Sequence, residues 1–255
     1  MTAIFYEFMV QSRYRVASAT GQADPGQQSE LQRRHDELAA EYDLQVTGYR
    51  FGECDFRFLS VRDSYALLDR ISPEEFLKDE QMPYWAEIWP ASVTLSNVIM
   101  DKLDLAGKSV IELGTGVGIA SVAAARKGAR VLATDYSTEA LRFVVYNALL
   151  NGITLETGRL DWRMVMTDEK FDVVIAADVL YERVNLLPIV TAIDALLKKG
   201  GAAYIADPRR RLAEQFLELV GENGFAVTET EMHDAVGDQT VSVTIYKLER
   251  VTECR

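Results

Sequence analysis

Residues 109–118 read Ser-Val-Ile-Glu-Leu-Gly-Thr-Gly-Val-Gly, a short apolar segment that runs into a carboxylate and then into alternating glycines. A second apolar segment, residues 130–134, ends in Asp135, twenty-one residues beyond Gly114. A strand, a glycine-rich turn, a helix and a strand that ends in an acid form one half of a nucleotide-binding fold. The stretch therefore predicts an α/β protein with a nucleotide site at the carboxyl ends of its strands.

The spacing of the glycines indicates which nucleotide is bound. A dinucleotide fingerprint that starts at Gly114 requires a glycine at position 119, where this chain has Ile119. Glu112 precedes the loop, and a carboxylate is a poor neighbour for a diphosphate. A ligand with an ammonium group and a ribose suits this acid better. The loop therefore favours S-adenosylmethionine over NAD, and a dehydrogenase stays the outside alternative.

Composition limits the class of protein. The chain has 255 residues, 48% of them hydrophobic and 26% charged, which is ordinary for a globular protein. No apolar run is long enough to span a membrane, and the N-terminal segment carries Glu7 and no basic region, unlike a signal peptide. Cys54 and Cys254 lie too far apart for a metal or redox motif, and His35 and His233 sit in no motif. We expect a cytoplasmic protein without a metal site.

The formal net charge of −12 bears on the partner. Nucleic-acid binding depends on phosphate neutralisation by Lys and Arg, so this charge argues against a DNA or RNA substrate. An acidic enzyme could instead attract a basic substrate such as a lysine-bearing protein. The dense basic run, residues 209–211, reads as the solvated first turn of a helix, with contact to an acidic partner as the alternative.

From residue 107 onward, apolar periodicity predicts alternating strands and helices. Beyond the first two strands, we expect strands within 155–161 and at 171–177, 202–206, 225–229 and 240–247, and helices at 119–127, 137–150, 188–198 and 209–220. The last two strands are separated by only ten residues, too few for a parallel crossover. The prediction is a doubly wound, Rossmann-like sheet of seven strands, six parallel and one, the last in the chain, antiparallel.

The N-terminal third carries weaker signals. Residues 18–30 read as a turn-rich linker, residues 31–42 are compatible with a helix, and residues 44–51 and 55–61 alternate as in a β-hairpin. We expect residues 1–80 to form an accessory region without chemistry and residues 81–255 to form the catalytic domain.

Four motifs within residues 83–247 carry a resemblance to a known family. They are the tryptophan-proline segment 83–92, the glycine loop, Leu160-Asp161-Trp162, and Asp178-Val-Leu-Tyr181. In this order they resemble the class I, seven-β-strand S-adenosylmethionine-dependent methyltransferases. The resemblance is strongest to the branch that contains non-SET protein lysine methyltransferases and nicotinamide-N-methyltransferase-like proteins, and it covers about two thirds of the chain.

The resemblance implies S-adenosylmethionine as the cofactor and S-adenosylhomocysteine as its product. Asp135 would bind the ribose hydroxyls, and Asp161 with Trp162 would meet the adenine. Trp89 would lie against the cofactor or the substrate entrance. The implied cofactor-binding residues share a place in or beside these motifs and are Trp89, Glu112, Gly114, Gly116, Gly118, Asp135, Tyr136, Asp161, Trp162 and Ala177.

Asp178 and Tyr181 are the implied catalytic residues, and physical reasoning supports them. Polar residues on a turn after a strand lie at the crevice where open α/β sheets bind ligands. Methyl transfer from a sulfonium mainly requires alignment, and an amine nucleophile must be neutral. A carboxylate and a phenol can orient such an amine and help to relay its proton, whereas a carbonyl nucleophile would find few donors. The pair therefore favours a nitrogen acceptor.

The leading hypothesis is an S-adenosylmethionine-dependent N-methyltransferase that methylates lysine in a protein substrate and works as a monomer. The alternatives are an N-methyltransferase of small-molecule amines or heterocycles and a catalytically silent scaffold that binds the cofactor. Core packing is the alternative interpretation of Trp85, Trp89 and Trp162, and a helix start is that of Tyr181.

Overall fold

The computed structural model describes residues 25–70, 82–236 and 239–251. The expectations for residues 18–24 and for Cys254 fall outside these ranges. Among the described residues, no helix is both long and apolar enough to cross a membrane.

A seven-stranded sheet forms the centre of the fold, with the strand order β5-β4-β3-β6-β7-β9-β8. Only β9 runs in the direction opposite to the other six strands, so the predicted six parallel strands and one antiparallel strand are confirmed. β9 does not extend the edge of the sheet but lies between β7 and β8. The strands are β3 (Ser109–Leu113), β4 (Arg130–Asp135), β5 (Glu156–Arg159), β6 (Phe171–Ala177), β7 (Leu197–Asp207), β8 (Phe225–Val236) and β9 (Gln239–Arg250).

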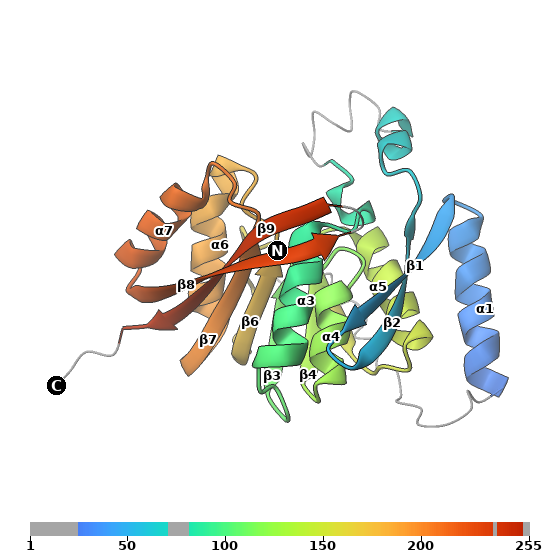
Figure 1. The fold of residues 1–255 in the computed structure, drawn as a ribbon, viewed down its shortest axis with the longest axis horizontal. Coiled ribbons are helices and arrows are strands. Elements are labelled where there is room, and N and C mark those ends of the chain that lie inside the picture. The colour runs from blue at the N-terminus through green and yellow to red at the C-terminus, as the bar shows by residue number, and fades with distance from the viewer. Residues whose placement is uncertain (1–24, 71–81, 237–238, 252–255) are drawn as a thin grey trace, which may run out of the picture.

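Helices cover both faces of this sheet (Figure 1). On one face lie α3 (Pro90–Lys102), α4 (Ile119–Arg126) and α5 (Thr138–Leu150), and on the other α6 (Arg183–Leu196) and α7 (Ala213–Glu222). Neighbouring residues of the central strands face opposite layers: Val110 and Val173 pack towards α3–α5, Ile111 and Val174 towards α6 and α7. Because both faces are buried, these strands read as continuous apolar runs.

Two helix starts differ from the prediction. α6 begins at Arg183 instead of residue 188 and keeps Pro188 inside the helix, because Leu186 is already part of the buried stripe. α7 begins at Ala213 instead of residue 209, because Arg209 adopts a left-handed φ of 61° and cannot start a helix. The basic run 209–211 is therefore a connecting loop and not a first helical turn.

The described part of the N-terminal region consists of α1 (Pro25–Ala39), the antiparallel hairpin of β1 (Leu44–Phe51) and β2 (Cys54–Val61), and the 3₁₀ turn η1 (Tyr65–Arg70). The hairpin is confirmed, but residues 25–30 belong to the helix and not to a linker. Pro25 starts this helix, where the absence of an N–H costs nothing. The division at residue 80 stays a prediction, although the hairpin shares one apolar core with α3–α5.

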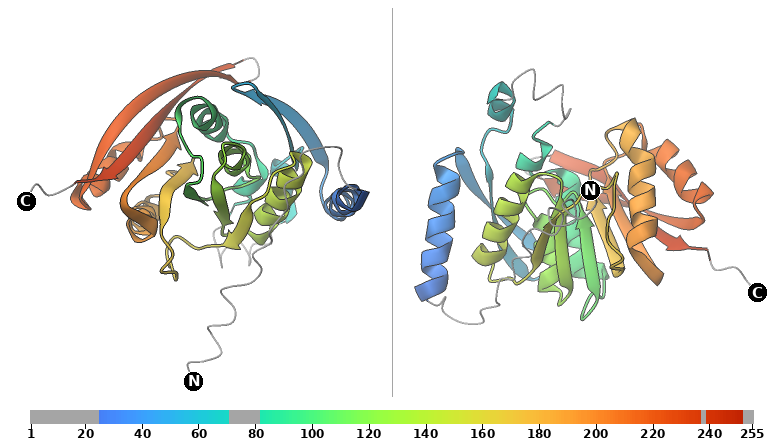
Figure 2. Two further views of the ribbon diagram at one scale, coloured as in Figure 1. Left: turned by 90° about the horizontal axis from the view of Figure 1, so that it is seen from below. Right: turned by 180° about the vertical axis from the view of Figure 1, so that it is seen from behind.

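The hairpin and the C-terminal strands form an outer cover over α3. Figure 2 shows β1–β2 and the long pair β8–β9 curving over the same side of the molecule. α3 contacts β1 as well as β7, β8 and β9. A second 3₁₀ turn, η2 (Tyr84–Ala86), precedes α3, so this cover holds the start of α3 and its tryptophan-proline segment against the large sheet.

Candidate active site

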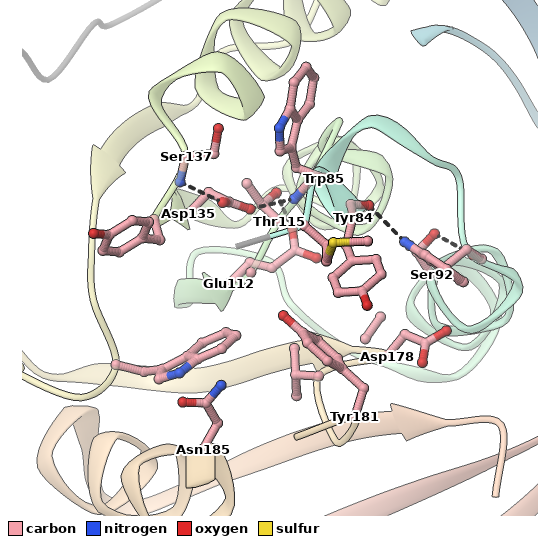
Figure 3. A pocket seen from close by; sticks show the side chains of 18 of the residues that line it. Tyr84, Trp85, Ser92, Glu112, Thr115, Asp135, Ser137, Asp178, Tyr181 and Asn185 are labelled. Carbon is pink, nitrogen blue, oxygen red and sulfur yellow. Dashed lines mark hydrogen bonds between the residues drawn. The ribbon is translucent and has the colours of Figure 1, made fainter. Parts of the chain in front are cut away.

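A cavity of about 360 Å³ lies at the carboxyl ends of β3, β4 and β6 and beside the loop after β5. This is where open α/β sheets bind their ligands. All but one of the predicted cofactor-binding and catalytic residues line it, and the exception is Gly118. The structure thus brings together residues from Trp89 to Tyr181, and Figure 3 shows many of their side chains.

The glycine loop approaches its neighbours too closely for side chains. Gly114, Gly116 and Gly118 have φ of 68°, 54° and 91°, in the region that favours glycine. A Cβ on Gly116 would lie 3.3 Å from the carbonyl oxygen of Trp85. A Cβ on Gly118 would meet Val144 of α5 at 3.1 Å, so Gly118 serves the packing of the loop on α5.

Glu112 is buried beneath the loop, with 1% of its surface exposed. The hydroxyls of Ser121 and Thr115 both donate hydrogen bonds to its Oε2 atom. Burial raises the pKa of Glu112 to about 7, although these hydrogen bonds oppose the rise. The side chain therefore fixes the start of α4 to the end of β3.

Asp135 joins two loops at the end of β4. Its carboxylate accepts hydrogen bonds from the backbone N–H groups of Gly116 and Ser137, each at 2.9 Å. Burial raises its pKa against the effect of these bonds. These N–H donors, with a further backbone contribution from Tyr136, leave part of the acceptor capacity of a carboxylate for further donors, such as a ribose hydroxyl.

The loop after β5 contributes an acid and an indole. Asp161 forms a short-range ion pair with Arg163, with Oδ1 2.9 Å from Nε. The ring of Trp162 lies against Gly114, where an added Cβ would come within 3.1 Å of it. Tyr136 also lines the cavity, and the guanidinium carbon of Arg159 lies 4.6 Å from the centre of its ring. The loop after β5 and the end of β4 thus each contribute one aromatic ring to the lining of the cavity.

The tryptophan-proline segment forms the wall opposite the sheet. Trp89 caps α3, and its Nε1 atom donates to the carbonyl of Tyr84 at 2.9 Å. Trp85 packs on Phe143 of α5 and on Tyr42, with ring centres 5.3 and 5.8 Å apart, respectively. Trp85 therefore both packs in the core and lines the cavity, so core packing and a place at the site both apply to it.

Asp178 and Tyr181 follow β6, as predicted. Asp178 is buried and adopts a left-handed φ of 60°. The Tyr181 ring lies edge-on to Tyr84, with centres 5.0 Å apart, and Figure 3 shows both rings beside Asp178. Burial raises the pKa of Tyr181 above its usual range, so it remains a neutral phenol.

Several residues at the site were not predicted. Arg210 forms an ion pair with Asp178, which corrects the interpretation of residues 209–211 as a solvated turn. Asn185 lines the cavity and donates to Glu182 at 2.6 Å, which leaves its buried Oδ1 without a partner among the described residues. Neither residue lies in one of the four motifs that carry the family resemblance, although Arg210 belongs to the basic run 209–211. The described residues contain no group of His, Cys, Asp and Glu suited to a metal.

Comparison with known proteins identifies relatives of this chain. The profile of a family described as "Lysine methyltransferase" matches residues 76–223, more than half of the chain. The histidine protein methyltransferase 1 homolog of Dictyostelium discoideum is 29% identical over 128 residues, 47% of this chain and 41% of that protein. The electron transfer flavoprotein beta subunit lysine methyltransferase of Homo sapiens is 34% identical over 135 residues, 50% of each chain.

The chain thus spans about half the length of these curated relatives or less. Among solved structures, ribosomal protein L11 methylase from Lactobacillus delbrueckii subsp. bulgaricus aligns with a TM-score of 0.52 and 23% identity. The alignment covers 64% of this chain and 80% of that one. At this identity the likeness bears on the fold alone.

Proposed function

We propose that this chain, which belongs to the lysine methyltransferase family, transfers a methyl group from S-adenosylmethionine to the side-chain nitrogen of lysine in a protein substrate. One observation carries the proposal. The carboxylate of Asp178 and the phenol of Tyr181 line the same cavity as the glycine loop and Asp135. A donor site and a pair of groups suited to an amine acceptor therefore face one space.

The residues of the cavity fit the cofactor. Its volume of about 360 Å³ lies in the range of small-molecule sites. Gly114 and Gly116 let the loop approach a ligand closely, Asp135 retains acceptor capacity for ribose hydroxyls, and Trp162 and Tyr136 present ring surfaces for adenine. The acids of the site suit the ammonium group of the methionine portion.

When bound, the cofactor supplies an electrophilic methyl group on a sulfonium, and transfer breaks the S–C bond, forms an N–C bond and leaves a neutral thioether. The protein aligns the acceptor. The Asp178 carboxylate accepts a hydrogen bond from the amine, and the Tyr181 phenol can donate or accept one. The amine must lose its proton to water before the attack. Alignment of this kind contributes several kcal/mol to the lowering of a barrier.

Three observations support a protein as the substrate. The family and the named relatives act, by their descriptions, on lysine or histidine of proteins. The net charge of −12 favours a basic partner. Tyr84 and Val184, which line the cavity, are 39% and 76% exposed, so the cavity is accessible to a side chain that projects from another protein.

We also propose that the protein acts as a cytoplasmic monomer and binds neither membranes nor nucleic acids. The acidic charge supports the absence of a nucleic-acid partner. Sedimentation analysis of the full chain tests the oligomeric state, because a concentration-dependent dimer would contradict this proposal.

The test has two parts. Calorimetry with S-adenosylmethionine and S-adenosylhomocysteine should show binding of both, and no binding of either at millimolar concentration would refute the cofactor. Incubation with methyl-labelled cofactor and a dialysed cell extract should then transfer label to protein. The small molecules removed by dialysis are then added back to the extract. Label that is found only in these small molecules would refute the protein substrate but not the cofactor.

A further inference from the structure

The ion pair between Asp178 and Arg210 joins two adjacent strand ends. Arg210 Nε lies 2.5 Å from Asp178 Oδ1, and the Asp178 side chain is only 3% exposed. The described chain contains two non-glycine residues with positive φ: Asp178, which forms this ion pair, and Arg209, which precedes Arg210. Left-handed backbone at such residues persists only where the surroundings hold it. The ion pair thus joins the two loops at the positions where their backbone is left-handed.

Arg210 is itself held in place by two further contacts. Its backbone N–H donates to Oδ1 of Asp207 at 2.7 Å, which shapes the turn after β7. Its guanidinium carbon lies 5.8 Å from the centre of the Trp89 ring, within the range of a cation–π interaction. Arg210 does not appear among the described residues that line the cavity, so it reaches Asp178 from outside the cavity.

The charge next to Asp178 is set mainly by Arg210. Burial raises the pKa of the Asp178 carboxyl, and the contact with Arg210 lowers it. The buried carboxyl of Asp207 lies behind, with its own pKa raised to about 6 by burial and by Asp178. Glu182, Asp135, Tyr84 and Arg210 all affect the pKa of the neighbouring Tyr181. On the side of β9, Asp207 and Arg209 affect the pKa of Tyr246. Within the described structure, no second cation contacts the Asp178 carboxylate.

We infer that Arg210 is a positioning residue for methyl transfer: it orients the Asp178 carboxylate and offsets its charge, so that an acceptor alkylamine is not stabilised as an ammonium ion. This inference rests on the proposed function: Arg210 would help to keep the lysine amine neutral and therefore nucleophilic.

The physical reason is a balance of charge. An unpaired, buried carboxylate stabilises a neighbouring ammonium and holds its proton on. An amine that keeps its proton has no lone pair for the attack on carbon. A carboxylate already paired with Arg210 still accepts a hydrogen bond through Oδ2 but binds a cation less strongly. A cation next to the site also favours the neutral amine, a known way to activate an amine nucleophile.

The direct test measures the binding of n-butylammonium, which carries the same alkylammonium group as a lysine side chain. The full chain is titrated by calorimetry in the presence of S-adenosylhomocysteine. Arg210→Gln should bind this probe more tightly than the wild type, by on the order of tenfold, because Asp178 becomes an unpaired carboxylate. A purely structural role for Arg210 would weaken binding instead. Unchanged or weaker binding by a folded Arg210→Gln variant overturns the inference.

Matched variants make the result specific. Arg211→Gln removes the same charge from an exposed residue of the same loop and should bind the probe as the wild type does. Arg210→Lys keeps the charge and should also match the wild type. Combining Arg210→Gln with Asp178→Asn should abolish the gain in affinity. A gain that persists without the Asp178 carboxylate would contradict the mechanism.

A second readout uses the protein that becomes labelled in the extract, purified and supplied at saturating concentration. In Arg210→Gln the ascending limb of the plot of kcat against pH should shift to higher pH by about one unit, because the bound amine holds its proton more strongly. An unmoved limb would overturn the inference. If the wild type methylates no protein, the proposed function fails, but the comparison of n-butylammonium affinities still decides the role of Arg210.

Discussion

Asn147 of α5 donates a hydrogen bond to the carbonyl oxygen of Val117 in the glycine loop, at 2.8 Å. The same side chain exchanges two hydrogen bonds with the backbone of Leu59 in β2, accepting at 2.7 Å and donating at 3.0 Å. One fully buried amide therefore connects the N-terminal hairpin, a core helix and the loop that shapes the cavity. The hairpin supports the site through this residue.

Replacing Asn147 with Ala should lower the free energy of unfolding by roughly 3 kcal/mol, because three hydrogen bonds vanish and backbone groups of Leu59 stay buried. Asn151, one turn later, is half-buried and binds the backbone of the exposed Arg57 in the same way. Asn151→Ala should therefore cost only about 1 kcal/mol. Urea unfolding compares the two, and equal costs would contradict the linking role of Asn147.

Gly116→Ala should reduce the affinity for S-adenosylhomocysteine at least about tenfold, because a Cβ at 3.3 Å from the Trp85 carbonyl must displace the cavity wall. Gly107 offers a control, since its φ is also positive, at 71°, but a Cβ there meets nothing within 4 Å. Gly107→Ala should carry a similar backbone strain and leave affinity unchanged. Calorimetry compares the affinities of the two variants for S-adenosylhomocysteine. Equal affinities would contradict the prediction, because they would mean that the backbone at Trp85 moves aside without cost.

Glu112 should make stability depend on pH. Its pKa is raised from 4.5 to about 7 in the folded protein, first by burial. The folded state therefore keeps a proton that the unfolded chain releases, and this contribution to stability is complete below pH 4.5 and lost as the pH rises through 7. Glu112→Gln removes it. From about pH 5 to about pH 8, the free energy of unfolding of the variant should fall less than that of the wild type, by roughly 2 kcal/mol.

The matching measurement is urea unfolding of both proteins at the two pH values. The other acids are common to both proteins, so the difference reports on Glu112 together with its electrostatic coupling to Asp135. A parallel pH dependence of the two proteins would mean that Glu112 is already ionised in the folded state.

The roles assigned to the acids should separate binding from turnover. Asp178→Asn should lower kcat at least about 100-fold while S-adenosylhomocysteine still binds, because Asn tolerates the left-handed φ and keeps the shape. Tyr181→Phe should likewise lower kcat and spare binding. Asp135→Ala should abolish cofactor binding, since it also releases Gly116 and Ser137. If all three variants lost affinity equally, the division of roles would be wrong.

Elements with local signals could be predicted from the sequence. The N-cap Ser137, whose hydroxyl accepts from Ala140, and Gly128 with its positive φ mark helix ends by themselves. The starts of α6 and α7 could not be predicted in this way. Pro188 inside α6 is tolerated because the helix buries Leu186 and Ile189 against the sheet. Arg209, with its left-handed φ, donates hydrogen bonds to Thr244 of β9 and Glu231 of β8, which are far away in the sequence.

The cavity shows the same division. Its strand-end residues, from Glu112 to Tyr181, lie in motifs whose position follows from the order of parallel strands. Arg210 contacts Asp178 across 32 residues of sequence, and only the pairing of β6 with β7 brings them together. Asn185 needed the early start of α6 to reach the cavity. Long-range pairs of this kind leave no local pattern.

The central claim is methyl transfer to lysine in a protein. It is tested most directly by amino-acid analysis of the protein labelled in the extract, with Asp178→Asn as the blank. We predict that the label is recovered as Nε-methylated lysine and is absent with the variant. Label recovered on another residue, only on small molecules, or equally with the variant would contradict the account.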